Sequence, residues 1–104
     1  MKKTRNEFRR NKRTNHPSYV FEQEGNYCKS HGLTHSKKTF GKDNIPLSQN
    51  PNPKDDRQAF ARPDVQCQHR ADYGKKYGEW TLSPGDIKRL EKRRLKDLKK
   101  KQKH

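Results

Sequence analysis

The sequence predicts one small domain of mostly β or α+β class, with a barrel-type body and a basic amphipathic helix near its C-terminal end. The chain has 104 residues, which is room for a single domain. Only 24% of these residues are hydrophobic, so any core is small. Nine residues are aromatic, and all but Phe8 lie between Tyr19 and Trp80. An ordered body is therefore expected in the middle of the chain, between looser ends.

The positive charge is concentrated at the two ends. The net charge is +15, of which residues 1–15 carry +6 (seven Lys/Arg, one acid) and residues 88–104 carry +8 (ten against two). Residues 16–87 carry only +1 (ten against nine). We therefore expect a flexible basic arm over residues 1–15, a single domain over 16–98 and a basic tail over 99–104. Such ends attract polyanions, for example a phosphate backbone.

A β-hairpin is predicted directly after the basic arm, in the stretch HPSYVFEQEGNYCKSHGLTH. Tyr19, Val20 and Phe21 favour a strand, Gly25-Asn26 is typical of a turn, and Tyr27–Leu33 resumes an extended run. These residues open a group of short strands that we expect to span residues 18–66.

Two further strands are predicted after the hairpin. Asn44–Ser48 is a short one, and Pro46 restricts it to a sheet edge or a bulge. Arg57–Gln66 is a second, interrupted at Arg62-Pro63. Residues 67–80 show no clear period and are expected to form a loop.

The clearest element is a helix over residues 84–98. Ser83 is a good N-cap, Pro84 suits the first helical position, and Asp86 completes a capping box. Four apolar side chains fall within one stripe at 100° per residue. They are Ile87, Leu90, Leu95 and Leu98. The helix should dock through this stripe and present its Lys/Arg face to solvent or to a polyanion.

Several classes of protein are disfavoured. No apolar run approaches the roughly 18 residues of a membrane span, and the basic N-terminus lacks the apolar region of a secretion signal. We therefore expect a cytoplasmic protein with no membrane partner. In that compartment its two cysteines should be free thiols.

Five residues are candidate metal ligands: Cys28, His31, His35, Cys67 and His69. Cys-x2-His and Cys-x-His pairs resemble half-sites for zinc, but their spacing does not match a zinc finger. In a strand, Cys28 and His31 would also point to opposite faces. We therefore predict no metal and no cofactor, with zinc as the weaker alternative.

Cleavage of RNA without a metal needs a base, an acid and a cation beside the phosphate. Imidazole suits proton transfer near neutral pH, because its ordinary pKa is about 6.5. The candidate catalytic residues are His16, Thr34, His35, Ser36, Arg57 and Arg62. Equally, a loop rich in His, Ser and Lys can simply be solvated.

Three short motifs, HPSYVF, GLTHS and NIPLS, occur in an order that resembles the MazF/PemK group of toxin endoribonucleases over residues 16–66. The resemblance implies a small SH3-like β-barrel that cleaves single-stranded RNA and is inhibited by an antitoxin. Its site would include His16, Thr34 and Ser36. This chain departs from the pattern of that group in three ways. His16 stands where the group has an arginine, and the opening strand and Gly-rich loop of the group are missing from this chain. The segment NPNPKDDRQAFARP has no counterpart in those toxins. The pattern also resembles uncharacterised small proteins of bacterial mobile elements.

Three functions follow from these observations. The first is a small basic protein that binds RNA, single-stranded or ribosomal, without catalysis. The second is a metal-independent endoribonuclease toxin with an antitoxin as partner. The third is a module that binds a protein partner and uses its charge for solubility. The residues expected to contact nucleic acid are Arg5, Arg9, Arg10, Lys12, Arg13, Lys37, Lys38, Asn50, Asn52, Lys54, Arg89 and Arg93.

The loop NPNPKDD has two possible roles. Each residue before a proline is pushed towards extended backbone, so the loop should be rigid. It can form one wall of a groove for an unpaired strand beside the Thr34–Ser36 turn. Alternatively, Asn50 and Asn52 only cap the turns of a connection between strands.

Overall fold

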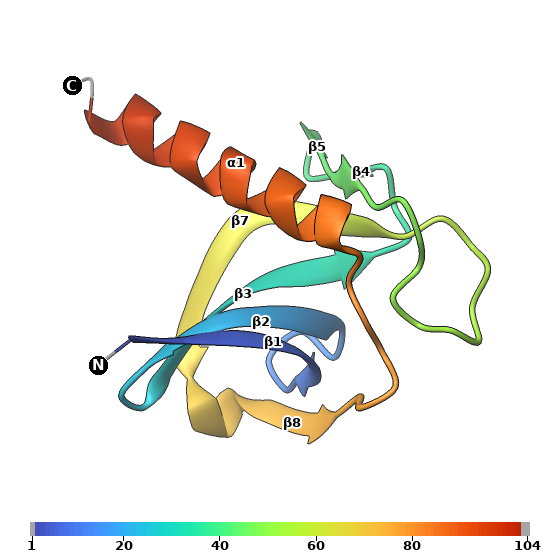
Figure 1. The fold of residues 1–104 in the computed structure, drawn as a ribbon, viewed down its shortest axis with the longest axis horizontal. Coiled ribbons are helices and arrows are strands. Elements are labelled where there is room, and N and C mark those ends of the chain that lie inside the picture. The colour runs from blue at the N-terminus through green and yellow to red at the C-terminus, as the bar shows by residue number, and fades with distance from the viewer. Residues whose placement is uncertain (1, 103–104) are drawn as a thin grey trace.

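The computed structural model describes residues 2–102, which form an antiparallel sheet, a separate small hairpin and a C-terminal helix (Figure 1). The six-stranded sheet has the order β6-β7-β3-β2-β1-β8. The elements are β1 (Lys2–Asn11), β2 (Pro17–Glu24), β3 (Tyr27–Thr34), β4 (Lys38–Thr39), β5 (Lys42–Asp43), β6 (Ile45–Pro46), β7 (Phe60–His69), the 3-10 turn η1 (Arg70–Asp72), β8 (Tyr73–Lys76) and α1 (Pro84–Gln102). The prediction of a mostly β body followed by a helix is therefore confirmed.

The sheet curves without closing into a barrel. β7 and β8 are consecutive in the chain, yet they lie on opposite sides of the β3-β2-β1 meander, and η1 joins them (Figure 1). β6 and β8 remain as the two edges. The body is thus a half-wrapped sheet, and α1 crosses the face near β7.

The predicted hairpin is present as β2 and β3. Glu24 pairs with Tyr27, and Gly25 in the turn between them has a φ of 59°, which glycine adopts without steric cost. The short strand β6 is at the sheet edge, as Pro46 requires.

The basic N-terminal segment is a strand rather than a flexible arm. β1 pairs with β2 on one side and with β8 on the other. Phe8 anchors it in the core with 1% exposure, packed on Tyr19 with ring centroids 5.2 Å apart. Its other side chains are mostly charged, so no apolar alternation marks this strand in the sequence. The strand forms because its backbone groups pair with neighbouring strands on both sides.

Two other boundaries differ from the prediction. β7 passes through Arg62-Pro63 and continues to His69, because the pairing with β3 shifts between Leu33↔Ala61 and His31↔Val65. This bulge accommodates a proline that has no N–H to donate to the ladder. The expected loop over 67–80 contains β8, where the Tyr73 hydroxyl lies 2.7 Å from Ser30 Oγ.

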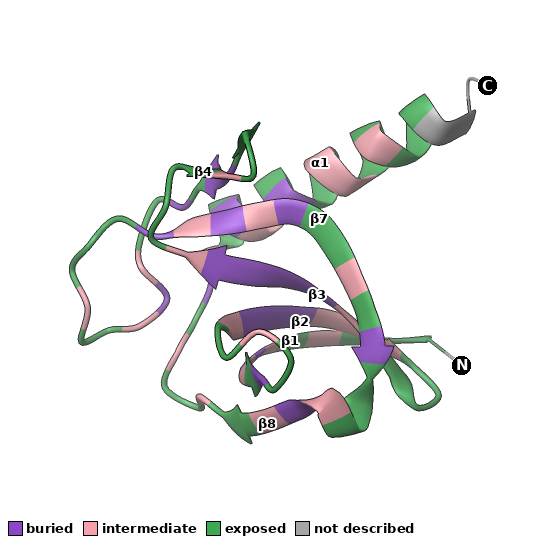
Figure 2. Cartoon of the chain, turned by 180° about the vertical axis from the view of Figure 1, so that it is seen from behind, coloured by how far each residue is buried: buried purple, intermediate pink, exposed green. Residues whose placement is uncertain are grey.

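The core is asymmetric about the sheet. The larger apolar cluster lies on the side covered by α1, and buried positions follow β2 and β3 (Figure 2). Its members are Phe8, Tyr19, Leu33, Ile45, Leu47, Ala59, Ala61, Leu82 and Leu90. A second cluster contains only Val20, Cys28 and Tyr73. Next to it, the buried Asn11 amide donates to Ser18, Gln66 and Gln68, so polar contacts replace apolar packing there.

α1 begins as predicted, and its end lies beyond the predicted one. Ser83 Oγ accepts a hydrogen bond from the Asp86 backbone N–H at 3.2 Å, which is an N-cap contact. The helix continues to Gln102, so the part of the expected tail that is described is helical. Leu90 is fully buried, whereas Leu95 and Leu98 are 60% and 54% exposed. The apolar stripe therefore docks only through its first half. None of the helical segments in residues 2–102 is long and apolar enough to cross a membrane.

Candidate nucleic-acid interface

A polar turn ends β3 at one end of the sheet. Thr34 Oγ1 accepts a hydrogen bond from Ser36 N–H at 3.1 Å, which shapes the Thr34–Ser36 turn. Because Ser18 pairs with Gly32 in antiparallel register, His16, just before β2, lies at the same end of the sheet. The topology thus brings four of the predicted catalytic residues to one end of the sheet: His16, Thr34, His35 and Ser36.

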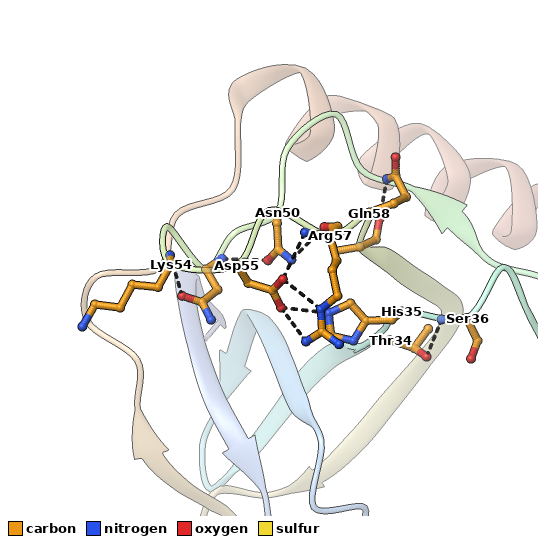
Figure 3. Close-up of polar contacts among 10 residues, drawn as sticks. Thr34, His35, Ser36, Asn50, Lys54, Asp55, Arg57 and Gln58 are labelled. Carbon is orange, nitrogen blue, oxygen red and sulfur yellow. Dashed lines mark hydrogen bonds and ion pairs between the residues drawn. The ribbon is translucent and has the colours of Figure 1, made fainter.

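A second segment adds a carboxylate to this edge. His35 Nε2 lies 3.1 Å from Asp55 Oδ2 in the loop between β6 and β7 (Figure 3). Arg57 holds the same carboxylate through two bonds, Nε to Oδ1 at 3.0 Å and Nη2 to Oδ2 at 2.9 Å. The hydrogen bonds from Arg57 are the main cause that lowers the pKa of Asp55. We refer to His35, Asp55 and Arg57 as the His–Asp–Arg cluster.

The cluster defines which imidazole nitrogen is available. Asp55 is an acceptor, so His35 Nε2–H donates to it, and in the neutral imidazole this bond leaves the lone pair on Nδ1. The His35 side chain is 48% exposed and that of Arg57 is 68% exposed, whereas that of Asp55 is 15% exposed. A partly covered carboxylate therefore orients an accessible imidazole, as in acid–base sites.

The loop that carries Asp55 is built from side-chain turns. Asn50 Oδ1 accepts from Asn52 N–H at 2.9 Å, Asn52 Oδ1 accepts from Lys54 N–H at 3.0 Å, and Asp55 Oδ1 accepts from Arg57 N–H at 3.0 Å. Asn50 Nδ2 also donates to the Arg57 carbonyl at 3.0 Å. Both asparagines thus cap turns of the loop. Asn50 also holds the backbone at Arg57 (Figure 3).

Arg62 does not join the cluster. Its side chain packs beside Gly32, where an added Cβ would lie 3.4 Å from Arg62 Cδ. The guanidinium lies 5.8 Å from the Phe40 ring centroid and 3.9 Å from Asp64. A role for Arg62 at the same phosphate as His35 is not favoured by these contacts.

The basic residues of β1 and the following turn are partly neutralised. Glu7 is contacted by Arg9 at 3.2 Å and by Arg5 at 3.6 Å, beside a cavity of about 360 Å³. Arg13 pairs with Asp72 at 3.2 Å. Arg10 and Lys12 are exposed and keep their full charge for a polyanion. Lys37, Lys38 and Lys54 are also exposed, near the polar end of the sheet.

On α1 the cations available to a ligand differ from those expected. Arg89 donates to the Pro46 carbonyl at 2.6 Å, and Arg93 pairs with Asp97 at 3.4 Å. Five lysines of α1 are exposed and have no carboxylate partner among the described residues: Lys88, Lys92, Lys96, Lys99 and Lys100. At 100° per residue the first four fall within an arc of about 80° and form what we call the lysine row. This lysine row was detectable in the sequence from its i, i+4 spacing.

A groove of about 1390 Å³ lies between the second half of α1 and the sheet. Within it, the Arg94 guanidinium lies 3.8 Å from the Phe21 ring centroid and donates to His31 Nε2 at 2.9 Å. Because Nε2 accepts this bond, His31 Nδ1–H donates to the Arg62 carbonyl at 3.0 Å. Burial is the main cause that lowers the pKa of His31 to about 4.

The Cys28/His31 and Cys67/His69 pairs do not form one site. His31 packs on the α1 side with Phe21, whereas Cys28 packs in the small cluster with Val20 and Tyr73. Cys67 is exposed, and His69 accepts a bond from Ala71 N–H at the start of η1. Within residues 2–102, His, Cys, Asp and Glu form no group of three or more that could hold a metal ion.

Two residues of this region were absent from the predicted site. Asp55 could have been found from the D-x-R spacing to Arg57, although its contact with His35 depends on tertiary structure. Phe40 is the other, an aromatic residue beside a glycine in a lysine-rich stretch. Comparisons with protein-family models, curated proteins and solved structures found no match to this chain.

Proposed function

We propose that the protein binds RNA, with the lysine row of α1 contacting phosphates and the polar end of the sheet contacting the strand itself. The observation that carries this proposal is the lysine row, because its four ammonium groups have no acidic partner among the described residues. Regularly spaced, unneutralised cations on a rigid helix are suited to a phosphate backbone.

Further features favour RNA over an acidic protein as the polyanion. Lys37, Lys38 and Lys54 are exposed near the His–Asp–Arg cluster, whose His35 and Arg57 side chains are 48% and 68% exposed. Unpaired nucleotides present both phosphates and base edges. A surface that combines cations with polar side chains can bind both. A single-stranded transcript and an unpaired region of ribosomal RNA share this chemistry, and the cytoplasm is where both would be encountered.

The lysine row should control the salt dependence of binding. Replacing Lys88, Lys92, Lys96 and Lys99 by Gln should reduce the slope of log K against log salt by up to about 3 for a single strand, since each lost phosphate contact removes about 0.7. Fluorescence anisotropy with a labelled 12-mer RNA from 50 to 300 mM KCl would measure it. The four Lys→Arg replacements keep the charge and should retain the slope. An unchanged slope in the Gln variant would contradict the proposal.

A second candidate function is cleavage of RNA, which the His35–Asp55 contact specifically favours. In this proposal His35 Nδ1 removes the proton of a ribose 2′-hydroxyl, and the resulting oxygen attacks the adjacent phosphorus. The P–O5′ bond breaks, a 2′,3′-cyclic phosphate forms, and the leaving oxygen takes a proton from His16. Arg57 Nη1, which has no hydrogen-bond partner among the described residues, stabilises the charge on phosphorus. An antitoxin would have to cover this end of the sheet.

Cleavage can be separated from binding with Asp55→Asn, which keeps the size of the side chain but removes its charge. Wild-type protein with labelled single-stranded RNA in EDTA should produce fragments with 2′,3′-cyclic ends. His35→Ala should abolish these, and Asp55→Asn should reduce the rate by about 10²- to 10⁴-fold while RNA still binds. Asp56→Asn, the same replacement at an exposed position of the same loop, is the control and should leave the rate unchanged. Intact RNA with wild-type protein would exclude catalysis and leave RNA binding.

A further inference from the structure

The tip of the β4–β5 hairpin carries a side chain that the fold does not use. Phe40 is 91% exposed, the most exposed of the large apolar residues described. The pairs Lys38↔Asp43 and Thr39↔Lys42 leave Phe40-Gly41 as a two-residue loop. The apolar ring is therefore barely buried and adds little to stability, so packing does not explain its position.

The backbone at Phe40 is also unfavourable for this residue type. Its φ is 51° and that of Gly41 is 78°, so both loop residues are left-handed, as in a type I′ turn. Asn, Asp or Gly is the usual choice for the first position, and a bulky side chain is strained there. A strained and exposed residue is typical of a functional position.

The hairpin holds Phe40 in a defined place relative to the polar end of the sheet. The buried Asn44 amide donates to the Ser36 carbonyl at 3.0 Å and to Thr39 Oγ1 at 2.8 Å. Asn44 N–H also donates to the Lys37 carbonyl at 2.9 Å. These bonds tie the base of the hairpin to the turn that presents His35, so the ring is preorganised rather than free to fold back.

The surroundings of the ring are basic. Lys37, Lys38 and Lys42 lie on the hairpin or next to it, and the Arg62 guanidinium lies 5.8 Å from the Phe40 centroid. Asp43 and Asp64 neutralise only part of this charge through contacts of 3.8 to 3.9 Å. An exposed aromatic ring surrounded by cations matches an unpaired nucleotide, whose base stacks on the ring while its phosphates face the cations.

We infer that Phe40 is the base-stacking residue of this protein and that the β4–β5 hairpin selects unpaired over paired RNA. This inference rests on the RNA-binding function proposed above and adds a residue and a strand preference to it. A base inside a duplex is already stacked on both sides, so only single-stranded RNA gains from the Phe40 ring.

Phe40→Asn tests the inference without the risk of unfolding. Asn is favoured at this turn position, so the melting temperature should stay the same or rise. Binding of a labelled 12-mer single-stranded RNA should weaken about tenfold, whereas binding of the corresponding 12-base-pair RNA duplex should not change. Tyr27→Asn is the control, since Tyr27 is an exposed aromatic (56%) at the opposite end of the sheet. It should change neither affinity.

Phe40→Trp provides a direct readout. It should retain single-strand affinity, and emission from the new indole, measured against the wild-type background of Trp80, should be quenched by single-stranded RNA only. Wild-type affinity in Phe40→Asn would overturn the inference and leave the proposed function standing. Equal losses for single strand and duplex, together with a shift in sedimentation, would overturn it in favour of a protein–protein contact. Failure of the wild type to bind any RNA would overturn the proposed function as well.

Discussion

His31 combines complete burial with two hydrogen bonds that require a neutral imidazole. Nδ1–H donates to the Arg62 carbonyl, and Nε2 accepts from Arg94, so protonation would place two cations 2.9 Å apart. Burial lowers the pKa of His31 to about 4, from an ordinary value of 6.5. At the scale of single residues, this imidazole connects β3, β7 and α1.

Stability should therefore depend on pH through His31. The unfolded chain binds a proton near pH 6.5 and the folded chain only near pH 4, so folding is favoured less as the pH falls through this window. The expected loss from pH 7 to below 4 is about 3 kcal/mol from this group. Urea unfolding at pH 7, 5.5 and 4.5 would measure it.

The matched variant is His31→Phe, which keeps an aromatic ring against Phe21 and has no group that titrates. It should be less stable at pH 7, because Arg94 loses an acceptor, but its stability should change less between pH 7 and 4.5. Asp55 has a lowered pKa and affects stability only at lower pH, where its carboxylate becomes protonated. The same pH slope in His31→Phe and wild type would show that other groups are responsible.

At the scale of elements, one carboxylate joins the start of α1 to the chain after β6. Asp86 is 1% exposed and accepts hydrogen bonds from Ser48 N–H at 3.0 Å and from Ser48 Oγ at 2.9 Å. The sequence pattern assigned Asp86 to a capping box within the helix, whereas its oxygens bind a segment 38 residues away. Its position in the first helical turn is also favourable for a negative charge.

Asp86→Ala should destabilise the protein by about 2 to 3 kcal/mol, since it removes a buried carboxylate and the charge-assisted bonds that Ser48 N–H and Oγ donate to it. For a domain of this size, that change lowers the melting temperature by roughly 8 to 20 °C. Asp97→Ala is the control, because its pair with Arg93 is on the helix surface and should cost less than about 1 kcal/mol. Similar melting temperatures for the two variants would contradict the assignment.

At the scale of the whole molecule, the two basic ends have different structural roles. β1 is an internal strand that contributes Phe8 to the core, whereas the described end of α1 carries exposed lysines. The same composition therefore produces a structural element at one end and a charged surface at the other. Any test of how the N-terminal charge affects RNA binding requires substitutions at exposed positions such as Arg10 or Lys12.

Removal of residues 1–11 should unfold the protein, because β2 and β8 would lose their shared partner and the core would lose Phe8. Phe8→Ala alone should cost about 3 to 5 kcal/mol. Removal of residues 99–104 should leave the melting temperature nearly unchanged, since Lys99 and Lys100 are exposed. Circular dichroism melts of the three variants would measure this. A cooperative melt near the wild-type temperature without residues 1–11 would show that β1 is dispensable.

The sequence by itself determined the features that depend on local chemistry. Strand-forming residues around Gly25-Asn26 produce the β2–β3 hairpin, Pro46 places β6 at an edge, and Ser83-Pro84 begins α1. Each depends on residues within a few positions of one another, so propensity and turn chemistry were sufficient. The concentration of charge at the ends likewise follows from composition alone.

Tertiary structure decided the rest, because it depends on residues far apart in the chain. β1 is a strand because it pairs with β2 and β8, and β8 is a strand because it pairs with β1, although neither has an alternating apolar pattern. The same long-range packing brings Asp55 to His35 and leaves Leu95 exposed on a helix whose first half is docked. Local sequence specifies which conformations each segment prefers, but pairing and burial between distant segments determine which side chains meet.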